Sequence, residues 1–211
     1  MKPITIALAK GRTAESTISL LENAGIHFPE FDPTSRKLIF HTQDQSVSLI
    51  CVKAVDVPTY VENGAADIGV AGKDTILESQ ADVYELLDLK IGACRFAVAG
   101  KPETSLGDAH QITVATKYPN VSRNHFLKKG IMAETIKLNG SVELAPLIGL
   151  ADVIVDIVET GTTLRENGLE VMEEIEPVST RLIVNKASFT TRSQATHDLI
   201  HKLQSAMEVE K

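Results

Sequence analysis

Residues 152–164 read DVIVDIVETGTTL, and this stretch decides the fold class. The β-branched run from Val153 to Val155 is typical of a strand that is buried on both faces. The residues that follow predict a tight turn, because Gly161 can adopt a positive φ and a threonine hydroxyl can cap a following helix. We expect this helix to run from Leu164 to Met172. A strand, a short turn and a helix in this order predict an α/β protein.

The same turn has the donors that a phosphate needs. The N–H groups that start a helix and the hydroxyls of Thr160, Thr162 and Thr163 can all donate to an anion. Asp156 and Glu159 place carboxylates beside these donors, which suits the hydroxyls of a sugar; Glu159 is unusual at an anion site unless Mg²⁺ or a sugar hydroxyl shares it. The pattern therefore predicts a sugar phosphate site. The alternative is an ordinary strand–turn–helix junction whose threonines only cap the helix.

Composition narrows the class of protein and of partner. The chain has 211 residues, of which 43% are hydrophobic and 23% charged, enough for one large or two small domains. A net charge of −7 argues against nucleic acid or an anionic membrane as the main partner. No apolar run approaches the roughly 20 residues of a membrane span, and the N-terminus lacks a signal-peptide pattern. We expect a cytoplasmic protein.

Cysteine and histidine offer no evident nucleophile or metal site. Cys51 and Cys94 lie in or beside apolar strand-like runs and form no CxxC pair, so we expect buried, reduced thiols. His197 and His201 stand one helical turn apart. They are either a metal pair that lacks evident further ligands or, as we expect, part of a solvated helix face.

Short β-branched runs alternate with amphipathic stretches along the chain, which predicts two α/β lobes with mostly parallel sheets. We expect residues 1–92 plus 180–211 to form the first lobe and residues 93–179 the second, with 102–107 as the most loop-like break. Strands are predicted at 4–9, 38–40, 47–52, 67–71, 83–89, 95–99, 112–115, 135–138 and 180–185, and helices at 14–24, 56–63, 74–80, 120–129, from 142, and at 193–209. Ligands of such folds bind at the carboxyl ends of strands. Polar residues follow five predicted strands, which favours a cleft for a polyanion: Lys10-Gly11-Arg12, Lys53, Lys73-Asp74, Lys117 and the Thr160 turn.

Four segments of the chain resemble the ATP phosphoribosyltransferase family, the first enzyme of histidine biosynthesis. They read ALAKGR, DVPTYVENGAADIGVAGKD, ATKYPN and IKLNGSVELAPLIGLADVIVDIVETGTTLRENGL. Their order and spacing over residues 4–169 make the resemblance specific. It implies a fold similar to the type II periplasmic binding proteins, in which two α/β lobes flank a cleft.

The resemblance also implies a reaction. N1 of ATP displaces pyrophosphate from C1 of phosphoribosyl pyrophosphate, with Mg²⁺ required, and gives phosphoribosyl-ATP. Pyrophosphate is a good leaving group once cations neutralise it, and adenine N1 carries no proton at neutral pH. Catalysis of this kind needs positioning and charge stabilisation more than a general base.

In the second lobe, the resemblance assigns roles to the residues of the turn. Asp156 would hold the ribose hydroxyls, and residues 160–163 would cradle the 5-phosphate. Glu143 would contact the sugar or its metal, so Glu143 and Asp156 are the candidate Mg²⁺ ligands. The other interpretation of Glu143 is a purely electrostatic role in the first turn of its helix.

In the first lobe, Lys10 and Arg12 resemble the family's N-terminal substrate contacts. Lys53 stands where members carry Lys or Arg, and Asp67 is a candidate contact for the nucleotide. Asp67 can equally cap a turn. Thr13 departs from the family pattern, in which an aliphatic residue is common after KGR.

The chain ends after one predicted tail helix, whereas the long form of the family continues as a histidine-binding regulatory domain. The resemblance therefore implies the short form, which works with a histidyl-tRNA-synthetase-like regulatory subunit in a hetero-oligomer. The competing hypothesis is a sensor of the binding-protein type that binds a small molecule without turnover. The turn at Thr160 argues against it, because a sensor does not need carboxylates for a sugar beside a phosphate site. A dinucleotide-binding oxidoreductase is excluded, because no GxGxxG follows the first strand.

Overall fold

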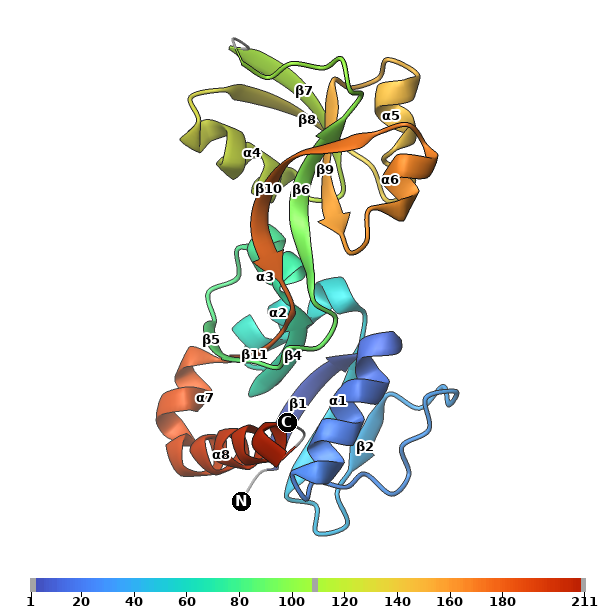
Figure 1. The fold of residues 1–211 in the computed structure, drawn as a ribbon. Coiled ribbons are helices and arrows are strands. Elements are labelled where there is room, and N and C mark those ends of the chain that lie inside the picture. The colour runs from blue at the N-terminus through green and yellow to red at the C-terminus, as the bar shows by residue number, and fades with distance from the viewer. Residues whose placement is uncertain (1–2, 108–109, 210–211) are drawn as a thin grey trace. The chain divides into compact units, whose positions relative to one another are not determined.

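The computed structural model describes residues 3–107 and 110–209, apart from the side chains of Arg12 and Val209. The chain divides into two compact units, unit 1 (Met1–Gly92 and Ser179–Lys211) and unit 2 (Ala93–Val178). The loop-like stretch at 102–107 lies inside unit 2 and does not separate the units. Each unit has its own sheet with flanking helices (Figure 1), so the α/β fold class is confirmed.

Unit 1 contains a six-stranded mixed sheet with the order β2-β3-β1-β4-β11-β5. Its strands are β1 (Ile4–Ala9), β2 (Ile39–His41), β3 (Val47–Val52), β4 (Ile68–Gly72), β5 (Tyr84–Asp88) and β11 (Thr180–Val184). β1 pairs in parallel with β3 and β4. β2 forms an antiparallel hairpin with β3, and β11 runs antiparallel to β4 and β5. The prediction of mostly parallel sheets is therefore wrong toward the sheet edges.

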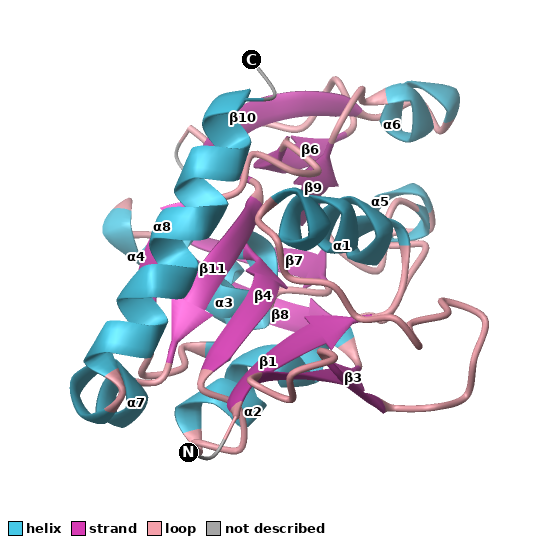
Figure 2. Cartoon of the chain, turned by 90° about the horizontal axis from the view of Figure 1, so that it is seen from below, coloured by secondary structure: helices cyan, strands magenta, loops and turns pink. Residues whose placement is uncertain are grey.

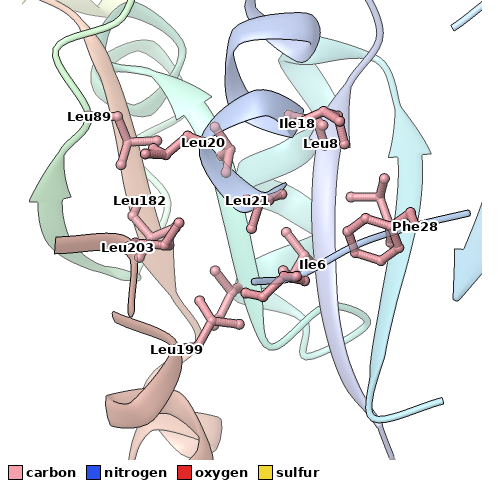
Figure 3. Packing of buried hydrophobic residues seen from close by; sticks show 14 of the residues in the cluster. Ile6, Leu8, Ile18, Leu20, Leu21, Phe28, Leu89, Leu182, Leu199 and Leu203 are labelled. Carbon is pink, nitrogen blue, oxygen red and sulfur yellow. The ribbon is translucent and has the colours of Figure 1, made fainter. Parts of the chain in front are cut away.

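Helices cover both faces of this sheet. They are α1 (Arg12–Asn23), the 3₁₀ turn η1 (Ala54–Asp56), α2 (Val57–Glu62), α3 (Lys73–Ser79), α7 (Lys186–Thr191) and α8 (Ser193–Val209). α1 and α8 lie side by side over one face (Figure 2). Alternate residues of a strand point to opposite faces. Ile6 and Leu8 lie on the face covered by α1 and α8, in one cluster with Ile18 and Leu21 of α1 and Leu199 of α8 (Figure 3). Ala7 and Ala9 of β1 point to the other face, where they pack with Val57 and Val61 of α2.

Unit 2 contains a five-stranded mixed sheet with the order β10-β6-β9-β7-β8. Its strands are β6 (Cys94–Gly100), β7 (Gln111–Thr116), β8 (Met132–Lys137), β9 (Val153–Val158) and β10 (Glu170–Val178), and its helices are α4 (Pro119–Lys128), α5 (Leu144–Leu147) and α6 (Thr162–Glu166). β7 pairs in parallel with β8 and β9, whereas β6 runs antiparallel to β9 and β10. On one face of this sheet, Ala97 and Ile154 pack in a buried cluster with Ala145 of α5 and Leu164 of α6.

The helix predicted from Leu164 to Met172 is wrong beyond Glu166. α6 ends at Glu166, Gly168 has φ 68°, and Met172 lies in β10. The glutamates of β10 favour a helix by propensity, but pairing with β6 along the whole strand satisfies the backbone instead (Figure 1). The short helix α7 was also not predicted.

Within the described ranges, no helix is long and apolar enough to cross a bilayer.

Candidate functional site

Asp156 lies toward the carboxyl end of β9, the central strand of the unit 2 sheet. Val153, Ile154 and Val155 are almost fully buried, as a strand covered on both faces requires. Asp156 is partly buried and pairs in register with Ala97 of β6. One oxygen of its carboxylate accepts a hydrogen bond from the N–H of Ile157 at 2.8 Å. The strand thus fixes the backbone on both sides of this carboxylate.

The turn after β9 adopts the left-handed conformation that the glycine permits. Gly161 has φ 71° and ψ 11° and is the N-cap residue of α6, with no side-chain cap hydrogen bond. The threonine hydroxyls instead lie against each other, with Thr160 Oγ1 3.0 Å from Thr162 Oγ1. The N–H of Thr162, the first residue of α6, also donates to Oγ1 of Thr160 at 3.4 Å. The Thr160 hydroxyl therefore contacts the start of the helix, and the capping interpretation stays a prediction beside the phosphate site. Because α6 spans only 5 residues, any helix dipole at the turn is weak.

Residues that the sequence grouped by pattern line one cavity of unit 2, of about 230 Å³. Its lining contains Glu143, Asp156, Ile157, Val158, Glu159, Thr160, Gly161, Thr162, Thr163 and Leu164. Glu143 comes from a different part of the chain, directly before α5. The cavity therefore combines three carboxylates with three hydroxyls and a glycine turn, and it can accept a ligand that has both hydroxyls and an anionic group.

Two arginines hold the backbone of this turn. Arg95 of β6 donates from Nη1 to the carbonyl of Glu159 at 3.3 Å. Its Nε lies 2.6 Å from a carboxylate oxygen of Glu174 in β10 and forms an ion pair with it. Arg165 of α6 donates to the carbonyl of Thr160 at 3.0 Å. Sequence reasoning missed Arg165, although it stands three residues after Thr162, where two side chains share one helix face.

In unit 1, two lysines lie at the carboxyl edge of the sheet. Lys10 and Lys53 come directly after Ala9 of β1 and Val52 of β3, which are register partners. Both lysines are exposed. Lys10 donates from Nζ to the carbonyl of Ser35. Adjacent strands therefore bring these two cations to one edge of unit 1.

Arg12 and Lys73 also follow strands of the unit 1 sheet. Arg12 is the first residue of α1, and its side chain lies outside the described part of the structure. Lys73 follows β4, and its Nζ lies 2.6 Å from the carboxylate of Glu85. This ion pair gives Lys73 a structural partner.

Asp67 lies at the opposite edge of unit 1, just before β4, and is 8% exposed. Its carboxylate accepts from the N–H of Thr5 at 2.9 Å, the hydroxyl of Ser188 at 2.7 Å and Nη1 of Arg192 at 3.1 Å. These contacts join the start of β1 to helix α7 and the residue after it. They support a structural role for Asp67, and its contact with the nucleotide stays a prediction.

The remaining cysteines and histidines do not gather into a site. Cys51 is buried, and burial raises the pKa of its thiol, which disfavours a nucleophile. The ring of His197 packs against Phe189, with 5.1 Å between centroids. Over residues 3–107 and 110–209, no group of three or more His, Cys, Asp and Glu side chains is close enough to hold a metal ion by itself.

Comparison with solved structures supports the fold. A chain of the "ATP phosphoribosyl transferase (HisG:HisZ) complex from Thermotoga maritima" is 35% identical with a TM-score of 0.85, and the match covers 97% of this chain and 98% of that one. The substrate-binding protein of an amino acid ABC transporter is 12% identical with a TM-score of 0.58, over 97% and 91% of the two chains. This second likeness concerns the fold alone, and it confirms the predicted likeness to binding proteins.

Comparison of sequences identifies the family. The HisG family model, described as ATP phosphoribosyltransferase, matches residues 53–205. An ATP phosphoribosyltransferase of Oceanobacillus iheyensis is 59% identical over 98% of this chain and 100% of the relative. One of Thermoanaerobacter sp. is 54% identical over 99% and 98%. The chain therefore belongs to the ATP phosphoribosyltransferase family.

Proposed function

We propose that the protein transfers the phosphoribosyl group of phosphoribosyl pyrophosphate to N1 of ATP and releases pyrophosphate, the first step of histidine biosynthesis. The observation that carries this proposal is the unit 2 cavity, where carboxylates lie beside a turn rich in hydroxyls. Membership of the family supports the same activity. The 5-phosphate would lie at residues 160–163, and the ribose hydroxyls would face Asp156.

In this arrangement, the protein works mainly by positioning and by charge. The bond between C1 and the pyrophosphate oxygen breaks, positive charge develops on the ribosyl ring, and the lone pair of adenine N1 forms the new C1–N1 bond. The carboxylate of Asp156, held at the end of β9, would stabilise that charge while it binds the hydroxyls. Because N1 carries no proton at neutral pH, no side chain has to remove one.

The carboxylates of the cavity also fit Mg²⁺. Mg²⁺ usually binds one or two protein carboxylates together with substrate phosphates and water, and Glu143 and Asp156 line the same cavity. These two residues would share the ion with oxygens of the substrate. Among the described residues, no group of three or more His, Cys, Asp and Glu side chains could hold the ion without the substrate. When bound, the ion neutralises charge on the pyrophosphate leaving group.

In unit 1, we assign Lys10, Arg12 and Lys53 to the anionic parts of the substrates. Lys10 and Lys53 are exposed and follow paired strands, and Arg12 stands two residues after Lys10. Positive charge at this edge would attract a triphosphate or pyrophosphate.

We further propose that the chain works in a hetero-oligomer with a regulatory subunit related to histidyl-tRNA synthetase, which would carry histidine feedback. The similarity to a chain of the HisG:HisZ complex supports this partnership. We place the activity in the cytoplasm, where both of its substrates are available.

The test is pyrophosphate release when the full chain, its regulatory subunit, ATP, phosphoribosyl pyrophosphate and Mg²⁺ are combined. Changing Asp156→Asn should lower kcat by roughly 10²-fold, because it removes a charge that acts in the transition state. Asp152→Asn is the matched control, since Asp152 stands on the same segment and accepts from the N–H of Thr113 at 2.7 Å. Equal rates for the two variants, or turnover that survives removal of Mg²⁺ with EDTA, would contradict the assignment.

A further inference from the structure

We propose that Arg165 is a positioning residue for the phosphate half of the site, and that its guanidinium directs the hydroxyls of Thr162 and Thr160 toward the bound anion. This inference rests on the proposed function, because it assumes that the 5-phosphate lies at the turn. Arg165 follows directly after Leu164, the last of the consecutive residues that line the cavity. Arg165 itself is not among the residues that line the cavity, so in this proposal it acts through the turn.

The guanidinium of Arg165 makes two hydrogen bonds to the turn. Nη1 donates to the carbonyl oxygen of Thr160 at 3.0 Å, and Nη2 donates to Oγ1 of Thr162 at 3.1 Å. The N–H of Arg165 also donates to the carbonyl of Gly161 at 3.1 Å. The side chain and backbone of one residue thus hold three consecutive residues of the turn.

These contacts set the direction of the hydroxyl pair. Arginine only donates hydrogen bonds, so Oγ1 of Thr162 must accept from Arg165 and its own proton must point elsewhere. The neighbouring oxygen at 3.0 Å is Oγ1 of Thr160. If Thr162 donates to it, the proton of Thr160 is left to point to a ligand. With phosphate bound, both hydroxyls donate to it in this proposal, because Arg165 donates to Oγ1 of Thr162 and leaves the proton of that hydroxyl for the anion.

The second contact orients the peptide between Thr160 and Gly161. In a trans peptide, the C=O and N–H groups point in opposite directions. Because Arg165 holds the carbonyl of Thr160, the N–H of Gly161 points away from the guanidinium. The same residue therefore sets the direction of one backbone donor and two hydroxyl donors.

Arg165 also supplies positive charge beside Glu159, whose negative charge would repel a bound anion. Glu159 brings a negative charge to the cavity in which an anion would bind. The positive charge of Arg165 next to the turn offsets it and polarises the hydroxyls that it contacts. Lysine would keep the charge, but a single ammonium group does not reproduce the planar fork that bonds a carbonyl and a hydroxyl together.

The test compares Arg165→Met and Arg165→Lys in the full chain. Arg165 is exposed, so both variants should fold, which circular dichroism checks. Arg165→Met should raise KM for phosphoribosyl pyrophosphate about tenfold, because charge-assisted hydrogen bonds are lost, and should leave KM for ATP unchanged. Calorimetry with ribose 5-phosphate should show a loss of similar size, and Arg165→Lys should recover only part of it.

Two controls make the result specific. Arg123→Met removes an exposed arginine of unit 2 that also makes two side-chain hydrogen bonds, to Thr135 and Asn120, and it should change neither KM. Thr162→Val should weaken ribose 5-phosphate binding less in the Arg165→Met background than in the wild type, since Arg165 acts through that hydroxyl.

An unchanged KM for phosphoribosyl pyrophosphate in Arg165→Met, an equal rise in KM for ATP, or full recovery by Arg165→Lys would overturn the role of Arg165. The proposed function would survive each of these results as long as the wild type turns over. A wild-type protein that neither binds ribose 5-phosphate nor releases pyrophosphate would instead overturn the proposed function, and this inference with it.

Discussion

Replacing Gly161 by alanine tests whether the shape of the turn, and not only its hydroxyls, binds the phosphate. Gly161 has φ +71°, and a Cβ placed there would lie 3.3 Å from Nη1 of Arg165 and 3.7 Å from Cγ1 of Val158. An L-residue in the left-handed region costs about 1–2 kcal/mol. The guanidinium of Arg165 is flexible and can move away from the added Cβ, but its hydrogen bond to the carbonyl of Thr160 is then lost. We expect Gly161→Ala to lower Tm by roughly 2–8 °C and to raise KM for phosphoribosyl pyrophosphate about tenfold.

Gly130 provides the matched control for this experiment. It has φ +73°, lies in the same unit, and has no heavy atom within 4 Å of the position of an added Cβ. Gly130→Ala therefore carries the same backbone strain without a neighbour to displace. Thermal unfolding should show a similar loss of Tm in both variants, while steady-state kinetics should show a raised KM only for Gly161→Ala. The reasoning is refuted if the two variants lose equal stability and keep the same KM.

Two further predictions concern carboxylates of unit 1. Asp67→Asn should lower the free energy of unfolding by roughly 2–3 kcal/mol in urea titrations, because it turns an amide toward donors such as Arg192, and KM for ATP should stay within about twofold; a changed KM at unchanged stability would instead support the nucleotide contact. Hydrogen bonds lower the pKa of Asp44 from 3.8 to about 2; the largest effect comes from the Thr42 hydroxyl and the next from Ser46. The stabilisation that Asp44 contributes is thus present above pH 3.8 and is lost as the pH falls through about 2. An NMR titration should find this midpoint, and Thr42→Val should raise it; a midpoint that does not move would contradict the role of that hydroxyl.

Local pattern predicted the main elements of the fold because their signals were strong. β1, β3 and α8 have the expected bounds, since β-branched runs and an amphipathic tail leave few other ways to bury their apolar side chains. β10 was missed for the opposite reason. Its glutamates favour a helix, and the pairing with β6 that makes it a strand involves residues 70 to 84 positions away along the chain.

The candidate site divides in the same way. The grouping of Asp156, Glu159 and residues 160–163 follows from their neighbourhood in sequence, and the structure brings Glu143 to the same cavity. The contacts of Arg165 could not be predicted, because the spacing permits them but only the path of the side chain makes them. For Asp67, sequence left a nucleotide contact and a structural role equally open, and the three donors around the buried carboxylate favour the second.

By itself, the sequence determined the α/β class, the turn after β9 and the family resemblance, because each depends on residues close together or on motifs in fixed order. Only the tertiary structure decided which strands run antiparallel, which carboxylates share a cavity and which arginines hold the turn. These features depend on hydrogen bonds and packing between segments that are distant along the chain. No local pattern encodes the distance between such segments.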